Sequence, residues 1–205
     1  VDSVKNQAQK DGLRVGEVYE YAAGTFDAVA TVKKFKETNA SVVLFLGSTS
    51  DLAPLMTEAE KASWFPQILL QSGGVTASVF DAPTGFENKV FFTLPSAPSD
   101  QTAEGLAEYR VLAEKYKLPP KHLAAQISAF TAAKLLIEGL KRAGKDLSRE
   151  RLIQVLEGFY EYKTGLTPPI TWGPNRRIGA MGAYVVRVDL KGKQFVPASG
   201  WVSIN

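Results

Sequence analysis

Hydroxyl side chains follow an apolar run of five residues in this sequence. Residues 42–46 read VVLFL, and Gly47 then leads into Ser48, Thr49 and Ser50. Such a run is typical of a buried strand, and the residues behind it have the spacing of a helix. The free amides at a helix N-terminus, together with nearby hydroxyls, can bind a polar or anionic group. These three hydroxyl residues are therefore candidate ligand-binding residues.

A second turn of small residues has the same position one repeat later. The strand predicted at residues 67–71 (QILLQ) is followed by Ser72, Gly73 and Gly74. Ligands of open α/β sheets bind beyond the carboxyl ends of the strands, and glycine lets a ligand come close to the backbone. Both turns can also be explained by a purely structural role, without a ligand. Ser50 or Asp51 would then be a helix N-cap and the two glycines a simple turn.

The sequence contains little that could carry out catalysis. The single histidine, His122, follows two prolines and a lysine at a predicted helix start, where a surface position is expected. The absence of cysteine excludes disulfides, thiolate metal sites and a cysteine nucleophile. No acidic cluster has metal-ligand spacing, and the phosphate-loop, dinucleotide-binding and nucleophile-elbow motifs are absent. We expect no catalytic residue, no metal and no cofactor.

The composition is that of an ordinary globular chain. Of its 205 residues, 45% are hydrophobic and 22% are charged. No uninterrupted apolar run approaches the ~18 residues of a membrane span. The formal charge of +3 comes largely from the end of the chain, where five basic residues follow Ile170 against one acid, Asp189. Without a groove-reading motif, this basic end is expected to be a solvated face rather than a nucleic-acid site.

The first half of the chain repeats one unit, which consists of a strand, a small-residue turn and an amphipathic helix. Strands are predicted at residues 15–21, 42–46, 67–71 and 89–95, with helices behind the first three. This alternation predicts a parallel sheet. The uninterrupted run VVLFL further predicts a strand covered by helices on both faces.

After residue 95 the predicted elements are consecutive helices. They fall at about residues 101–116, at 123–140 and behind an N-cap at Ser148, followed by a short strand (ITW) and a closing hairpin around KGK. Three helices with one short strand make a poor core, because their apolar faces need a sheet to cover. The chain begins inside a predicted helix without a methionine. We infer that it is a piece of a longer protein, whose preceding part would supply that sheet.

The order of these features resembles the type I periplasmic solute-binding proteins of the leucine/isoleucine/valine group. The resembling motifs in the first half are Phe26-Asp27, the strand opening at residues 39–43, Gly47, the acidic helix segment 58–60 and Phe65-Pro66. Residues 127–146 and 164–177 are similar to a later helix and turn of that family. The similarity extends over nearly the whole chain.

This resemblance implies an α/β fold with two lobes, at least one of them a parallel sheet in three αβα layers. Residues 1–94 and 182–205 would form the second lobe. Residues 95–181 would form the mostly helical C-terminal part of the first lobe, whose N-terminal part is absent.

The resemblance also implies the function, which is that of a solute-binding component of an ABC importer in the periplasm or another extracytoplasmic space. Its partners would be a small solute, enclosed by hinge closure, and the membrane permease; no nucleic acid is implied. The family's second-lobe ligand contacts fall on Ser48, Thr49 and Ser50 and on Ser72, Gly73 and Gly74. Amino-acid binders of the group carry an acid in the second loop and often an aromatic residue in the first. This sequence has neither, and a buried ammonium needs a counter-charge. An amide, a carboxylate or an aromatic acid, in general a small polar or anionic molecule, is therefore favoured over a branched-chain amino acid.

Two other functions are open at this point. A ligand-sensing domain of a regulator or receptor can use the same two-lobed fold, and a DNA-binding module upstream would indicate it. An α/β enzyme acting on a sugar phosphate or nucleotide sugar would need a metal or an acid/base pair, which these residues do not provide.

Overall fold

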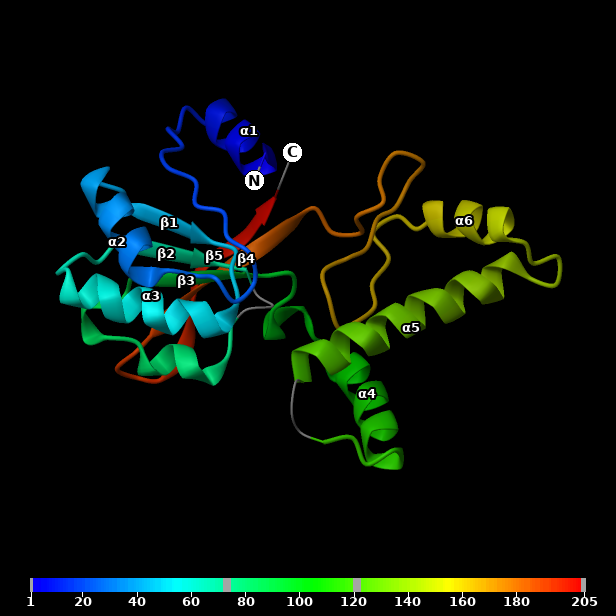
Figure 1. Ribbon diagram of the computed structural model, residues 1–205. Coiled ribbons are helices and arrows are strands. Elements are labelled where there is room, and N and C mark those ends of the chain that lie inside the picture. The colour runs from blue at the N-terminus through cyan, green and yellow to red at the C-terminus, as the bar shows by residue number, and fades with distance from the viewer. Residues whose placement is uncertain (1, 72–74, 120–122, 204–205) are drawn as a thin grey trace. The chain divides into compact units, whose positions relative to one another are not determined.

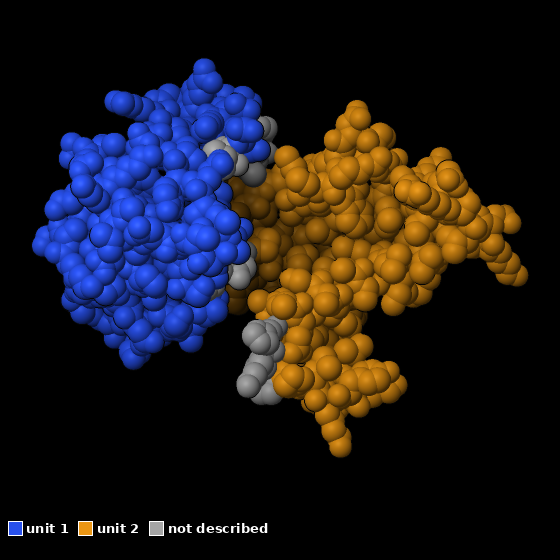
Figure 2. Space-filling view, in the orientation of Figure 1, with its two compact units in different colours: residues 1–93, 185–198 blue, residues 94–184, 199–205 orange. Residues whose placement is uncertain are grey.

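The computed structural model of this chain describes residues 2–71, 75–119 and 123–203. The chain divides into two compact units, coloured separately in Figure 2. Unit 1 comprises residues 1–93 and 185–198, and unit 2 comprises residues 94–184 and 199–205.

The sheet has five strands in the order β1-β2-β3-β4-β5 (Figure 1). They are β1 (Val42–Phe45), β2 (Gln67–Leu70), β3 (Val90–Leu94), β4 (Gly182–Asp189) and β5 (Gln194–Ser203). The first three are parallel, with Val43 opposite Ile68 and Ile68 opposite Val90. The strands predicted at residues 42–46, 67–71 and 89–95 and the closing hairpin are therefore confirmed.

Two helices of unit 1, α2 (Ala28–Glu37) and α3 (Thr49–Lys61), lie side by side over this sheet (Figure 1). Asp27 caps α2, because its carboxylate accepts a hydrogen bond from the backbone of Ala30 at 2.9 Å. Residues at helical spacing in α3, among them Leu55 and Met56, are buried with alternate residues of β1 to β3. Burial of these apolar side chains is the main source of stability for unit 1.

One face of β1 remains open, which contradicts the prediction of helices on both faces. Val43 and Phe45 are 7% and 8% exposed, whereas Val42, Leu44 and Leu46 are 49%, 42% and 50% exposed. Successive side chains of a strand point to opposite faces, and α2 and α3 cover only one of them. The first helix, α1 (Asp2–Lys10), has no buried residue.

The strand predicted at residues 15–21 is wrong, since this segment has no regular secondary structure. A strand requires a neighbour for its backbone hydrogen bonds. β1 lies at the edge of the sheet, and its only partner among the described strands is β2. The helix predicted after residue 71 is replaced by two short 3₁₀ helices, η2 (Ala77–Asp81) and η3 (Thr84–Phe86).

Unit 2 contains a short 3₁₀ helix, η4 (Pro98–Asp100), and three longer helices. These are α4 (Ala103–Lys115), α5 (Leu123–Ala143) and α6 (Arg149–Glu157). The predicted cap of α6 is confirmed, because the backbone of Arg151 donates to Ser148 Oγ at 3.0 Å. The short predicted strand ITW is reduced to an isolated bridge between Ile170 and Tyr162.

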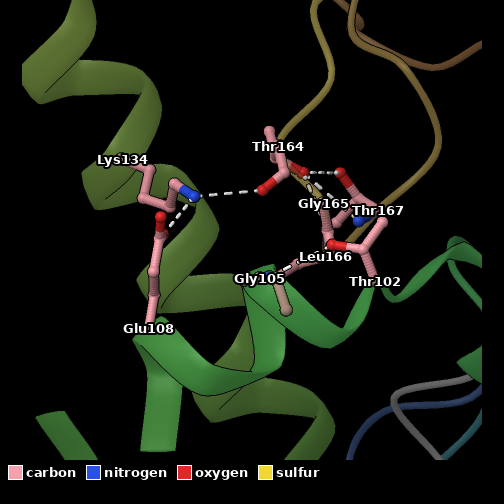
Figure 3. Close-up of polar contacts among 8 residues, drawn as sticks. All are labelled: Thr102, Gly105, Glu108, Lys134, Thr164, Gly165, Leu166 and Thr167. Atoms are coloured by element: carbon pink, nitrogen blue, oxygen red, sulfur yellow. Dashed lines mark hydrogen bonds and ion pairs between the residues drawn. The ribbon is translucent and has the colours of Figure 1, made fainter. Parts of the chain in front are cut away.

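A loop at residues 164–167 contacts both α5 and the start of α4 in unit 2 (Figure 3). The backbone N–H of Thr102 donates to the carbonyl of Gly165 at 2.9 Å, and Lys134 donates to the carbonyl of Thr164 at 3.1 Å. A Cβ on Gly105 would lie 2.3 Å from the Gly165 carbonyl oxygen. The absence of a side chain at Gly105 is therefore what lets the loop contact α4.

Candidate functional site

The carboxyl ends of β1 and β2 are neighbours in the sheet, as predicted. Phe45 lies opposite Leu70 in the parallel register. The chain beyond Phe45 enters the turn at Gly47 and then α3, so this end of the sheet carries the predicted hydroxyl residues. Ser72, Gly73 and Gly74 lie outside the described residues, and their proposed role stays a prediction.

The hydroxyls behind β1 form a small network at the start of α3. Ser48 is the N-cap, and its Oγ accepts a hydrogen bond from the backbone N–H of Ser50 at 3.4 Å. The two Oγ atoms of Ser48 and Ser50 lie 2.8 Å apart, and both residues are exposed. Thr49 is the first residue of the helix. The capping role thus belongs to Ser48 rather than to Ser50 or Asp51. The ligand-binding role of residues 48–50 stays a prediction.

Tyr21 comes to the same turn from the segment before α2. Its hydroxyl donates to Oδ2 of Asp51 at 3.0 Å, and Oδ1 of Asp51 lies 3.5 Å from Ser50 Oγ. Burial is the largest cause that raises the pKa of Tyr21, followed by the hydrogen bond to Asp51. The phenol is consequently protonated at neutral pH and acts as the donor to the carboxylate.

Aromatic rings surround this turn on one side. Tyr21 lies 5.7 Å from Tyr19 and 4.8 Å from Phe26, measured between ring centroids, and Phe26 lies 6.3 Å from Phe45. A Cβ on Gly47 would lie 2.0 Å from Tyr21 Oη. Glycine at this position therefore allows the tyrosine hydroxyl to reach the turn.

The contribution of Tyr21 was not predicted from the sequence. The first loop itself contains no aromatic residue, and the structure supplies one from a distant segment. The alternation in residues 15–21 was a usable signal, because it places Tyr19 and Tyr21 on one side of an extended chain.

The groups available at this turn can form hydrogen bonds with a ligand. The turn offers serine hydroxyls, the N-terminus of a helix of 13 residues and one carboxylate. Among the ion pairs of the described residues none involves Asp51, whose hydrogen-bond donors are neutral hydroxyls. Within residues 2–71, 75–119 and 123–203, no group of three or more histidine or acidic side chains is placed to hold a metal ion.

Solved structures with similar folds come from several organisms. A branched-chain amino acid ABC transporter protein from Thermus thermophilus with bound valine is 18% identical, with a TM-score of 0.77 over 98% of this chain and 56% of that one. A substrate-binding protein of an ABC transporter from Aeropyrum pernix is 17% identical, with a TM-score of 0.80 over 99% of this chain and 56% of that one. A fatty acid ABC transporter substrate-binding protein from Thermomonospora curvata is 17% identical, with a TM-score of 0.73 over 100% of this chain and 54% of that one.

These similarities confirm the predicted fold, which is that of a type I periplasmic binding protein. The chain spans little more than half the length of each of these solved chains. No curated protein matches it. The family described as periplasmic binding protein matches residues 1–194, and the chain therefore belongs to the periplasmic binding protein family.

Proposed function

We propose that this chain is part of a solute-binding component of an ABC importer, outside the cytoplasm, which passes a small polar or anionic molecule to a membrane permease. The candidate solutes are an amino acid, an amide or an aromatic carboxylate. One observation carries the proposal. In a member of this family, two exposed hydroxyls, a helix N-terminus and a carboxylate that has no cationic partner among the described residues lie together at the carboxyl end of β1.

Each group at this turn has a role that follows from its chemistry. The hydroxyls of Ser48 and Ser50 can donate to a carbonyl or carboxylate, and the start of α3 favours negative charge there. Asp51 can accept from an amide or an ammonium group. Tyr21 holds the carboxylate of Asp51 in place through its hydrogen bond of 3.0 Å.

Asp51 changes the choice among the solutes. The amino-acid option lacked a counter-charge in the second loop, and Asp51 offers one at the first loop. The similar Thermus thermophilus structure contains bound valine, and the similar Thermomonospora curvata protein serves a fatty acid ABC transporter. Amino acids and carboxylates therefore both belong in the experiment.

The experiment measures the melting temperature of the longest naturally encoded polypeptide that contains residues 1–205. Valine, leucine, glutamine, benzoate and a short fatty acid are added separately in millimolar amounts. A ligand at 100 times its Kd stabilises the folded protein by about 2.7 kcal/mol. A rise in melting temperature with one class of solute is the expected result. If none of these solutes and no wider panel of amides and organic acids raises it, the proposal is wrong.

A matched pair of variants then identifies the class of solute. Asp51→Asn keeps the shape of the side chain and removes its charge. An amino acid that uses this carboxylate should lose about 1.5–3 kcal/mol of binding free energy. A carboxylate ligand should bind equally well or better, because a nearby negative charge has been removed. Thr38→Ala is the control. Thr38 is the C-cap of α2, so this change should alter the affinity for neither class of solute.

A further inference from the structure

Three strands carry the chain between the two units. The boundaries of the units fall after Thr93, after Tyr184 and after Ala198. These positions lie inside β3, β4 and β5. Within residues 1–205, a movement of one unit against the other therefore has to bend these three strands. Such bending is normally absorbed by a few residues at the ends of regular elements.

Side chains of unit 2 link the three crossings to one another. The hydroxyl of Tyr184, in β4, donates to Oδ1 of Asp100 at 2.6 Å. Asp100 is the last residue of η4, the 3₁₀ helix that follows β3. The ring of Tyr184 packs edge-on against Trp201 of β5, with 5.2 Å between the ring centroids. We refer to Asp100, Tyr184 and Trp201 as the crossing clamp.

The hydrogen bond of the crossing clamp joins two well-positioned groups. Oδ2 of Asp100 accepts from the backbone N–H of Ala97 at 2.7 Å, so both oxygens of this carboxylate are engaged. The hydrogen bond to Asp100 is the largest cause that raises the pKa of Tyr184, followed by burial. The phenol is therefore protonated at neutral pH and donates to a charged acceptor. Hydrogen bonds to charged groups are shorter and stronger than those between neutral groups.

Gly182 allows β4 and β5 to approach closely beside the crossing clamp. A Cβ on Gly182 would lie 2.4 Å from the carbonyl oxygen of Val202 and 2.7 Å from Cε2 of Trp201. A backbone carbonyl cannot move aside as the end of a flexible side chain can. The absence of a side chain at position 182 is therefore what lets Trp201 pack beside the start of β4.

The chain before β4 is anchored to the core of unit 2. The backbone N–H of Thr171 donates to the carbonyl of Gly179 at 2.9 Å. Ala180 packs against a buried cluster that includes Phe159 and Ile170. Tyr184 lies four residues further along, at the boundary itself. Through Tyr184, the other two crossings are thus connected to a part of the chain that is held by the core.

We propose that Tyr184 is a positioning residue for solute binding, because its hydrogen bond to Asp100 makes the three crossings bend together. With the clamp intact, the units close in one way, and the solute-binding groups meet in one arrangement. Without it, each crossing bends separately, and fewer molecules are ready to bind. The apparent affinity falls in proportion to that fraction. The effect on the solute rests on the proposed function, whereas the coupling of the crossings does not.

The test compares two variants of the longest naturally encoded polypeptide that contains residues 1–205. Tyr184→Phe keeps the ring against Trp201 and removes only the hydrogen bond. Tyr109→Phe is the matched control. Tyr109 of α4 also donates at 2.6 Å, to Oε1 of Gln126, and its ring also packs edge-on, against Phe130. Both changes remove one phenol hydrogen bond from unit 2, but only Tyr184 lies on a crossing strand.

The first measurement needs no solute. Lys33→Cys in unit 1 and Lys145→Cys in unit 2 are exposed positions for two spin labels, and residues 1–205 contain no cysteine of their own. Any cysteine elsewhere in the polypeptide is replaced by serine. Pulsed electron paramagnetic resonance then gives the distribution of distances between the labels. In Tyr184→Phe the share of molecules outside the main peak should rise about 2–13-fold, as expected for one lost hydrogen bond. Tyr109→Phe should leave the distribution unchanged.

The second measurement is the affinity for the solute that raises the melting temperature. It should fall in Tyr184→Phe, by at most about 13-fold, and stay unchanged in Tyr109→Phe. If no solute binds, the proposed function is wrong, and the distance distribution alone decides whether Tyr184 couples the crossings.

Three results would overturn the proposal. The first is a distance distribution that is the same in Tyr184→Phe as in Tyr109→Phe, which indicates that the hydroxyl only stabilises unit 2. The second is a broader distribution with an unchanged affinity, which excludes a positioning role. The third is a Tyr184→Phe protein that does not fold, because the hydroxyl is then required for the fold itself.

Discussion

The hydroxyl of Tyr21 lies 3.0 Å from Oδ2 of Asp51, although 30 positions separate the two residues in the sequence. This hydrogen bond ties the segment before α2 to the first turn of α3. It also brings an aromatic ring to the turn that carries Ser48 and Ser50. The organisation of the candidate site therefore depends on a contact between two segments rather than on the loop alone.

Removing the tyrosine hydroxyl should have a small effect on stability and a larger effect on the position of Asp51. Tyr21→Phe deletes one hydrogen bond at a partly exposed site, which costs about 0.5–1.5 kcal/mol of unfolding free energy. Urea denaturation of both proteins measures this cost. A loss above about 4 kcal/mol would show that Tyr21 has a core role instead.

The same pair predicts a dependence of stability on alkaline pH. The pKa of Tyr21 is raised in the folded protein, chiefly by burial and then by Asp51. A raised pKa contributes stability that is fully present below the pKa of the unfolded tyrosine, about 10. This contribution is lost as the pH rises through the higher folded value. The difference in unfolding free energy between wild type and Tyr21→Phe should therefore shrink above about pH 10. A difference that stays constant up to the alkaline limit of reversible unfolding would contradict this.

Gly47 should tolerate no side chain while Tyr21 is present. In Gly47→Ala the added Cβ would lie 2.0 Å from Tyr21 Oη and 2.7 Å from Phe45 Cζ, which predicts a loss of about 1–3 kcal/mol from overpacking. Adding Tyr21→Phe removes the nearer contact and should restore part of that loss. A double-mutant cycle measures this coupling. Strict additivity of the two changes would show that the hydroxyl does not approach Gly47.

Gly105 provides a corresponding test in unit 2. Its missing Cβ would lie 2.3 Å from the backbone carbonyl oxygen of Gly165, which cannot move as a side chain can. Gly105→Ala should therefore destabilise the protein by about 1–3 kcal/mol and displace the loop at residues 164–167. Gly173→Ala is the matched control, because no atom lies within 4 Å of its added Cβ. Equal melting temperatures for the two variants would contradict the close contact at Gly105.

Much of the fold was predictable because local patterns determine it. The helical spacing of Leu52, Leu55 and Met56 and the apolar run of β1 required only the sequence, and the structure confirms both elements. The prediction of a strand at residues 15–21 is wrong, although apolar and polar residues do alternate there. A strand exists only with a partner, and β1 pairs with β2 alone among the described strands.

The candidate site was predictable only in part. The adjacency of the ends of β1 and β2 follows from the order of parallel units and is confirmed. Tyr21 was not predicted, because its approach to Asp51 depends on the path of the chain between residues 22 and 27. The exposed face of β1 was also not predicted. An apolar run indicates that both faces of a strand are normally buried, but it does not indicate which residues bury them.

The central claim is that the turn behind β1 binds the solute. Nuclear magnetic resonance tests it most directly. The sample is the longest naturally encoded polypeptide that contains residues 1–205, and the ligand is the solute that raises its melting temperature. The backbone amides of Gly47, Ser48 and Ser50 should shift as the solute is added, and the amide of Thr38 should not. In Ser48→Ala/Ser50→Ala the affinity should fall by about 5–150-fold, from two lost hydrogen bonds of about 0.5–1.5 kcal/mol each. Saturable binding that leaves these three amides unmoved would contradict the account.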